Sequence, residues 1–436
     1  MIRPTKYASM GATSGPAQVS WTSVRGYIFG ALFAALIVPN SILVMCFGFA
    51  GLSGGSVFTG GFLTVITLGI GLLYRRGQWA MMPTDYLFAT LVALIAVSFA
   101  LNVWVNDARE LALLVLSLGA YLVCRSISSV EYCPARSSLI LTLAVIVVAG
   151  TAATCAALIP QWDSDHGKPL VFDFSDAAPT FFLQSLGFLI LALATSGKLN
   201  LRQTAIATPL IFFSIAVYAA SLVRFTFLAL VGSLVIAVMF SQPRQRRYVI
   251  AMLLVVSMGI GAGLTARFAQ VKRMSGHIFE QSQGEPGLDR PPSCYLNVNP
   301  SNSISIRKAL AQDAMFLIPR SGWFGTGLDS FMTFSCIKRN TVHNSILQTF
   351  VEFGWLGGAT FVVLLIAAAV PLLPLARRED PARFILCGLA FSVSLSLAHG
   401  RISRDIPVFA FLGAAAGLCE AYRSRRHPSP TFSAVL

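Results

Sequence analysis

Long, continuous apolar stretches constrain the fold of this chain more than any other feature. Twelve of them, each about as long as a membrane-spanning helix, follow one another from residue 27 to residue 422. Hydrophobic residues make up 55% of the 436 residues and charged residues 11%, against about 25% charged in soluble domains. The runs do not alternate between apolar and polar residues as strands of a membrane barrel would. We therefore predict an all-α, polytopic membrane helical bundle of about twelve spanning helices. The predicted spans are 27–49, 56–74, 85–102, 109–125, 138–159, 179–196, 204–222, 225–240, 248–266, 345–373, 383–399 and 405–422.

The net charge of +14 would suggest a nucleic-acid partner in a soluble protein. Here the basic residues mostly form short clusters between apolar runs, which is typical of orientation in a bilayer, and we expect no nucleic acid. With the N-terminus inside, inner segments hold 18 Lys and Arg residues and short outer loops hold five. This bias predicts that both termini are cytoplasmic. The predicted organisation is a cytoplasmic tail (1–26), spans one to nine (27–266), a large, partly helical periplasmic loop (267–342), spans ten to twelve (343–422) and a second cytoplasmic tail (423–436).

The periplasmic loop is the only long segment between the predicted spans, and a loop of this length is usually functional or disordered. It contains several aromatic residues and an amphipathic apolar run from Ile304 to Ile318. We therefore expect an ordered cap with one or two short helices near the outer membrane face. Its nine basic and five acidic residues leave a charge of +4, which indicates either a site for an anion or an ordinary solvated surface.

Two cysteines, Cys294 and Cys336, share this outer loop. In a bacterial periplasm they can form a disulfide that closes the loop, whereas the alternative is two free thiols. The sequence does not give the distance between them, on which the bond depends.

Arginine is the natural side chain to hold a phosphate, because its planar guanidinium donates two parallel hydrogen bonds. Arg224 lies between two spans with almost no loop, where a charge is costly and often functional. The turn that contains Arg401 and Arg404 lies on the same side, and Arg267 begins the periplasmic loop. Interfacial arginines that extend toward the head groups, or ordinary loop charges, are the simpler interpretation.

No metal-binding motif is evident on the outer side. One outer loop carries four aspartates, Asp163, Asp165, Asp173 and Asp176. A solvated acidic loop explains them most simply, and a weak site for a divalent cation is the alternative. We expect no metal and no cofactor.

The dipeptide His343–Asn344 stands directly before a long apolar run. If His343 begins a helix, the helix dipole lowers the pKa of its imidazole and keeps it neutral. A neutral imidazole can accept a proton as a general base. Asn344 would then orient the histidine or bind a sugar hydroxyl. The alternative is a structural histidine at the membrane interface.

Two stretches of the C-terminal half resemble the bacterial O-antigen ligase/polymerase family of membrane glycosyltransferases. They are SIRKALAQDAMFLIPRSGWFGTGLDSF (305–331) and VHNSILQTFVEFGWLGG (342–358), and SLVRFTFLALVGSLV resembles the family's earlier arginine-containing helix start. The family pattern is an Arg, a Pro followed by G-x-G, then H-N, then E-x-G-x-x-G. It falls here on Arg307, Pro319, Gly325, Gly327, His343, Asn344, Glu352, Gly354 and Gly357. The chain departs from the pattern at Leu310, at Val223 and Phe225 beside Arg224, and in an apparent insertion, 275–302.

The resemblance implies a metal-independent, inverting glycosyltransferase of the bacterial inner membrane that acts at the periplasmic face. Its donor would be a glycan on undecaprenyl diphosphate, and its acceptor lipid A core or a second lipid-linked glycan. His343 would take a proton from the acceptor hydroxyl, while Arg224 and Arg307 would hold the diphosphate. Asn344, Arg267, Arg401, Arg404 and Glu352 are accessory candidates, and Glu352 would brace the helix.

Three functions remain open on the sequence. A ligase would move the glycan onto lipid A core, and a polymerase would extend an O-antigen or exopolysaccharide on its carrier. A transporter or flippase of lipid-linked glycans would instead show inverted repeats and polar residues at mid-membrane, which the sequence does not display.

Overall fold

The computed structural model describes residues 21–51, 56–72, 80–102, 108–129, 132–162, 168–196, 201–276, 290–295, 303–337 and 340–426. Within these ranges the protein is built from helices, and the one β-type pairing is an isolated bridge between Val171 and Ser175. The all-α class predicted from the apolar runs is confirmed.

Each of the twelve predicted spans contains helix. The bundle consists of α1 Trp21–Ile37, α2 Pro39–Ala50, α3 Ser56–Leu72, α4 Pro83–Leu101, α5 Ala108–Cys124, α6 Tyr132–Leu158, α7 Ala178–Ala194, α8 Leu201–Ala220, α9 Phe225–Phe240, α10 Pro243–Ala266, α15 Gly354–Ala376, α16 Asp380–His399 and α17 Ile406–Arg426. Among the described residues, seven helices are long and apolar enough to cross a membrane, and α1 with α2 makes an eighth if the bent pair is one span. The chain is a multi-pass membrane protein.

The first predicted span is bent rather than straight. Helices α1 and α2 meet at an angle of 85° where Val38 leaves the helical conformation and Pro39 begins the next helix. Proline has no N–H to donate to the preceding turn, and its ring excludes the carbonyl there. The other four segments that fall short of a full span are the apolar helices Phe58–Leu72, Ala178–Ala194, Ile206–Ala220 and Phe225–Phe240.

Helices α16 and α17 form the centre of the bundle. In their apolar stretches 61% and 72% of the residues are buried, against 28% in both α10 and α15, which lie at its periphery. The ring of Phe411 on α17 contacts those of Phe33, Phe188 and Phe384, with centroids 5.5–5.9 Å apart. These contacts bind α17 to α1, α7 and α16, so the loops at either end of these helices are held in fixed positions.

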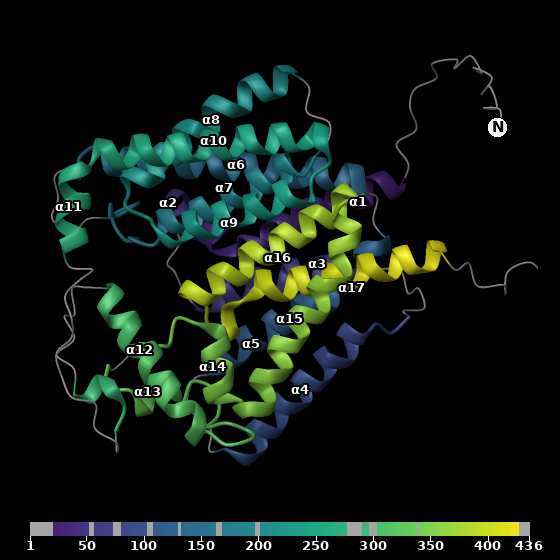
Figure 1. Cartoon of the computed structure of the whole chain (residues 1–436), viewed down its shortest axis with the longest axis vertical. Helices are drawn as coiled ribbons and strands as arrows, with labels where there is room; N and C mark the ends of the chain where they lie inside the picture. The colour runs from purple at the N-terminus through teal and green to yellow at the C-terminus, as the bar shows by residue number, and fades with distance from the viewer. Residues whose placement is uncertain are drawn as a thin grey trace, which may run out of the picture.

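Three further helices lie outside the bundle: one continues from the end of α10, and two lie beside α14 Ser345–Glu352 (Figure 1). They are α11 Phe268–Gly276, α12 Ser303–Leu317 and α13 Phe331–Phe334. We call the described part of 267–342 the cap. Leu310, Ala314 and Phe331 form a small apolar cluster that also includes Val351 of α14. The ordered, partly helical cap predicted from the run 304–318 is therefore present, with α12 over that run.

A disulfide between Cys294 and Cys336 closes the cap. Beside it the buried carboxylate of Asp313 accepts hydrogen bonds from the hydroxyls of Ser293 (2.5 Å) and Ser335 (2.7 Å). Asp313 therefore ties α12 to both of the segments that the disulfide joins. Of the apparent insertion 275–302, residues 277–289 and 296–302 lie outside the described residues.

The predicted span 345–373 differs from the structure at its start, because two helices meet there. Helix α14 ends at Glu352 and α15 begins at Gly354, with Phe353 between them. The cap segment 322–327 lies across this break. Thr326 and Gly327 donate to the carbonyls of Val351 and Glu352 (3.1 and 2.9 Å), and the N–H groups of residues 355 and 356 donate to carbonyls 322 and 323. The break thus exchanges helical hydrogen bonds for bonds to the cap.

Candidate functional site at the cap end of the bundle

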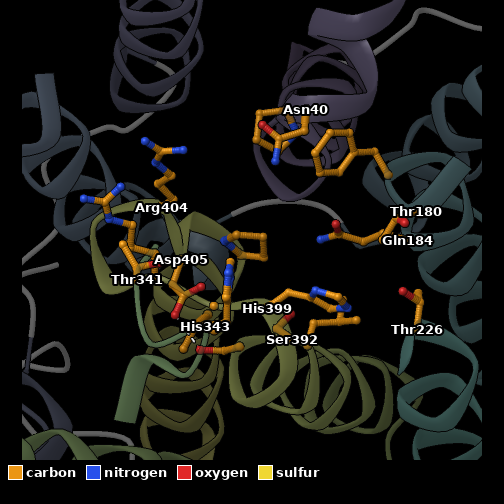
Figure 2. A pocket seen from close by; sticks show the side chains of 18 residues that line it. Asn40, Thr180, Gln184, Thr226, Thr341, His343, Ser392, His399, Arg404 and Asp405 are labelled. Carbon is orange, nitrogen blue, oxygen red and sulfur yellow. Dashed lines mark hydrogen bonds between the residues drawn. The ribbon is translucent and has the colours of Figure 1, made fainter. Parts of the chain in front are cut away.

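A cavity of about 290 Å³ lies at the cap end of the bundle (Figure 2). Its walls come from α2, α7, α9, α16, α17 and the segment before α14. Asn40, Gln184 and Thr226 lie on one side of it, His343, Arg404 and Asp405 on the other, and His399 between them. Most of the residues that line it are polar, although α2, α7, α9, α16 and α17 are mainly apolar along their length. Such a concentration of polar residues at the end of an apolar bundle makes this cavity the candidate binding site.

His343 lines this cavity from the segment that leads out of the cap. Its backbone has a φ of +56°, a conformation that non-glycine residues seldom adopt. Burial lowers the pKa of its imidazole below the ordinary 6.5, and the charges of Arg307 and Arg401 lower it further. The imidazole is therefore neutral at pH 7. This neutrality is the predicted one, but its cause is burial beside two arginines rather than the start of a long helix, since α14 has only eight residues.

Arg307, on α12 of the cap, does not line the cavity, but it lies close enough to His343 to lower the pKa of that residue. Its guanidinium stacks on the ring of Phe225, 5.1 Å from the centroid, and His399 meets the same ring edge-on at 5.6 Å. Phe225 is a position where the chain departs from the family pattern, and here it provides a platform that joins the cap to α9 and α16. Burial lowers the pKa of Arg307, so desolvation weakens its charged state and favours an anionic partner.

Arg224 directly precedes Phe225 at the start of α9, and burial lowers its pKa as well. Sequence reasoning did not single out a third cation, Lys168. Burial lowers the pKa of Lys168, and the positive charges of Arg307 and Arg224 lower it further. The carboxylate of Asp176 acts in the opposite direction and raises it. The two predicted arginines and Lys168 therefore form one cationic group, which we call the basic cluster. Only the fold brings Lys168 there, because it is more than 50 residues from Arg224 along the chain.

Arg401 and Arg404 also line the cavity, but both are already engaged by carboxylates. Arg404 pairs with Glu110, and Arg401 pairs with Asp329 and lies 3.3 Å from Glu110. Glu110 is almost fully buried at the start of α5 and accepts a further bond from Ser403 (2.6 Å). These pairs fix the turn 400–405 to α5 and to the cap. The carboxylates also compensate much of the positive charge of both arginines.

Two other predicted residues, Asn344 and Arg267, hold backbone structure in place. Asn344 caps α14, its side-chain oxygen accepting from the N–H of Leu347 at 3.0 Å. Arg267 is 1% exposed and donates to the carbonyls of Ala220 (3.2 Å) and Trp162 (2.8 Å), and it does not line the cavity. Arg267 thus joins the end of α10 to α8 and to the loop after α6.

Glu352 ends α14 and is fully buried. Its carboxyl accepts a hydrogen bond from Gln348 (3.0 Å), and Gln348 in turn accepts one from the N–H of Ile402 (3.1 Å). This chain of contacts holds α14, and with it the His343 segment, against the turn that contains Arg401. The bracing role expected for Glu352 stays a prediction.

Glu352 gives the protein a pH-dependent stability of predictable sign. Burial raises the pKa of its carboxyl from 4.5 to about 8, so the folded protein keeps a proton that the unfolded chain loses above about pH 4.5. Stability therefore falls as the pH rises from about 4.5 to 8, by up to about 1.4 kcal/mol per pH unit. We expect the Tm of the wild type to fall between pH 6 and pH 8 and that of Glu352→Gln to fall much less. Parallel losses in the two proteins would contradict this assignment.

The acidic loop gives no sign of a metal site in the part that can be seen. Asp163 and Asp165 lie outside the described residues, whereas Asp173 and Asp176 are exposed or half-buried. Across the described ranges no group of three or more His, Cys, Asp or Glu side chains is placed to hold a metal ion.

Comparison with known proteins finds a family similarity over the part of the chain that carries His343. Residues 209–362 match the family model described as O-antigen ligase. The match spans about a third of the chain and includes Arg224, Arg307, His343 and Glu352, whereas Lys168 and the turn at Arg401 lie outside it. No curated protein and no solved structure matches the chain significantly. The resemblance noted in the sequence is confirmed over residues 209–362, which include His343 and Arg307, and this part of the chain is similar to the O-antigen ligase family.

Proposed function

We propose that the protein transfers a glycan from undecaprenyl diphosphate to a sugar hydroxyl at the periplasmic face of the bacterial inner membrane. The family match supports an O-antigen ligase-type glycosyltransferase in general, and the donor, acceptor and mechanism are our proposal. One observation carries it: a neutral histidine lines a cavity at the end of an apolar bundle, and Arg307 of the basic cluster lies close enough to lower the pKa of that histidine. A base beside a diphosphate-binding group is what this transfer requires.

In the proposed step, His343 takes the proton from the acceptor hydroxyl as the hydroxyl oxygen attacks the anomeric carbon of the donor. The bond from that carbon to the diphosphate oxygen breaks, and the electron pair leaves on undecaprenyl diphosphate. Arg307 and Arg224 hold the diphosphate and stabilise the charge that it gains, so the step needs no metal. Attack from the face opposite the leaving group inverts the anomeric centre. Asn344 and Glu352 hold the segment that carries His343.

The volume of the cavity is consistent with a site that binds only the reacting sugars. Ligand pockets usually measure about 300–1,000 Å³, and this cavity of about 290 Å³ is at the small end of that range. It has room for the reacting end of a glycan rather than for a whole chain. In our proposal the acceptor sugar binds beside the turn 400–405. The guanidinium groups of its two arginines are paired with carboxylates but can still donate hydrogen bonds to sugar hydroxyls.

The acceptor decides between ligase and polymerase. We propose the ligase, with lipid A core as acceptor, and keep extension of a lipid-linked O-antigen or exopolysaccharide as the alternative. The test supplies purified protein with an undecaprenyl-diphosphate-linked oligosaccharide, with or without lipid A core and in the presence of a chelator. Glycan on lipid A core supports the ligase, and longer lipid-linked chains support the polymerase. Movement of the donor across vesicles without a new glycosidic bond would replace both by a flippase.

Arg307 should be needed for the chemical step. We expect Arg307→Gln to lower kcat about 10²–10³-fold, because it removes a cation that stabilises the departing diphosphate. Arg307→Lys should recover only part of the rate, since an ammonium group cannot form the paired hydrogen bonds. The matched control is Lys308→Gln, which removes the neighbouring charge from the exposed face of the same helix. Equal rates in the Arg307→Gln and Lys308→Gln proteins would contradict a diphosphate-binding role.

A further inference from the structure

A second and larger cavity, of about 550 Å³, lies at the opposite end of the bundle from the cap. It is enclosed by α1, α6, α16 and α17, together with the start of α10. In Figure 1 the first turn of α1 and the last turns of α17 lie on the side away from α12, α13 and α14. This cavity shares no lining residue with the one that contains His343. The transfer reaction proposed above does not use it.

The back wall of this cavity is apolar. Phe29 and Phe33 of α1, Leu139 of α6, and Phe384 and Ile385 of α16 form it, and all five are otherwise buried. These residues belong to helices in the membrane-spanning part of the molecule. A ligand that fills this wall therefore has a hydrocarbon portion.

The mouth of the same cavity is cationic. Arg136, Arg378 and Arg425 line it, and the Nε–H of Arg136 is enclosed without a hydrogen-bond partner among the described residues. Two carboxylates, Glu379 and Asp380, also line the mouth.

The two carboxylates do not cancel the arginines. Asp380 is already held by Arg383 at 3.0 Å and by Gln245 at 3.2 Å, and Arg383 itself does not line the cavity. Glu379 accepts a bond from the hydroxyl of Tyr422. Three arginines thus face a single carboxylate that has no cationic partner of its own. An anion with one or two negative charges would neutralise the remaining positive charge.

We infer that this cavity binds the phosphate head group of an anionic phospholipid from the leaflet at that end of the bundle. On the orientation that the basic residues predict, this is the cytoplasmic leaflet. Basic pockets between spanning helices on that side recognise anionic head groups. The arginines would hold the phosphate, and the apolar wall would receive the glycerol and the first acyl carbons. The apolar wall is what favours a lipid over a soluble phosphate.

The test compares binding of phosphatidylglycerol and phosphatidylcholine to the purified full-length protein in nanodiscs, read by native mass spectrometry of retained lipid. The variant Arg136→Gln/Arg378→Gln/Arg425→Gln should retain at least tenfold less phosphatidylglycerol than the wild type. A single Arg136→Gln protein should lose part of it, and this variant serves if the triple variant does not fold.

The matched control removes the same charge from the same end of the molecule. Arg244, Arg246 and Arg247 are exposed on α10 and do not line the cavity, and their triple change to Gln should leave lipid retention unchanged. Equal losses in the two triple variants, or equal retention of the two lipids by the wild type, would overturn the inference. Displacement of the lipid by millimolar glycerol 3-phosphate would also overturn it, in favour of a soluble phosphate ligand.

Discussion

His343→Asn should lower the rate of glycan transfer by about 10²–10⁴-fold, the usual contribution of a general base. Asparagine is the informative replacement because it adopts a positive φ more readily than most residues, so the backbone at +56° is retained while the base is lost. The measurement is the initial rate of transfer from a lipid-linked donor, at matched levels of folded protein. Unchanged donor binding in the variant would assign the loss to chemistry.

The pH dependence gives a second readout of the same residue. The pKa of His343 lies below 6.5, so kcat/KM of the wild type should hold down to pH 6.5 and fall only at lower pH, as the imidazole takes up a proton. The residual activity of His343→Asn should lack this acid limb. A variant that keeps both the full rate and the acid limb would remove His343 from the mechanism.

Gly354→Ala should unfold or seriously loosen the cap end of the molecule. Gly354 has a φ of +73°, and a Cβ there would lie 2.4 Å from the backbone of Trp323 and Gly325. The left-handed conformation costs about 1–2 kcal/mol with a side chain, and overpacking against backbone about 1–3 more, for a total of about 2–5 kcal/mol. We expect a lower Tm and rapid proteolysis between the cap and α15.

A second glycine-to-alanine change serves as the control for Gly354→Ala. Gly261 lies within α10 with open space where a Cβ would be placed, so Gly261→Ala should leave the Tm unchanged or slightly raised. Gly325→Ala, which would place a Cβ 2.3 Å from the Glu352 carbonyl, should resemble Gly354→Ala. Equal Tm values for Gly354→Ala and Gly261→Ala would show that the cap does not depend on this close approach.

Much of the fold could be predicted from the sequence because a bilayer leaves few alternatives to a helix. Each predicted span contains helix, and the cap helix α12 covers the predicted amphipathic run. The break at Gly354 was not predicted, although Glu352 and Gly354 interrupt the apolar run there. The break depends on hydrogen bonds from residues 322–327, which lie about 30 residues earlier. Pro39 explains the bend at Val38, but the sequence does not give the angle of the bend.

The candidate site was predicted only in part. His343 and Arg307 carry local motifs, and the structure brings them close enough for the arginine to lower the pKa of the histidine. Lys168 belongs to no motif, and its place beside Arg224 and Arg307 depends on how distant loops meet. The carboxylate that engages Arg404, Glu110, lies almost 300 residues away in sequence. Side chains that act through such partners cannot be identified from local patterns.

The most direct test of the account is formation of a new glycosidic bond by the purified protein. Wild type and His343→Asn would receive the same undecaprenyl-diphosphate-linked oligosaccharide and lipid A core, and the product glycan and the released undecaprenyl diphosphate would both be measured. The account predicts equal amounts of glycan and released carrier with the wild type, and at least a hundredfold slower formation of both with the variant. Absence of transfer by wild-type protein with bound donor, or equal rates in the two proteins, would contradict it.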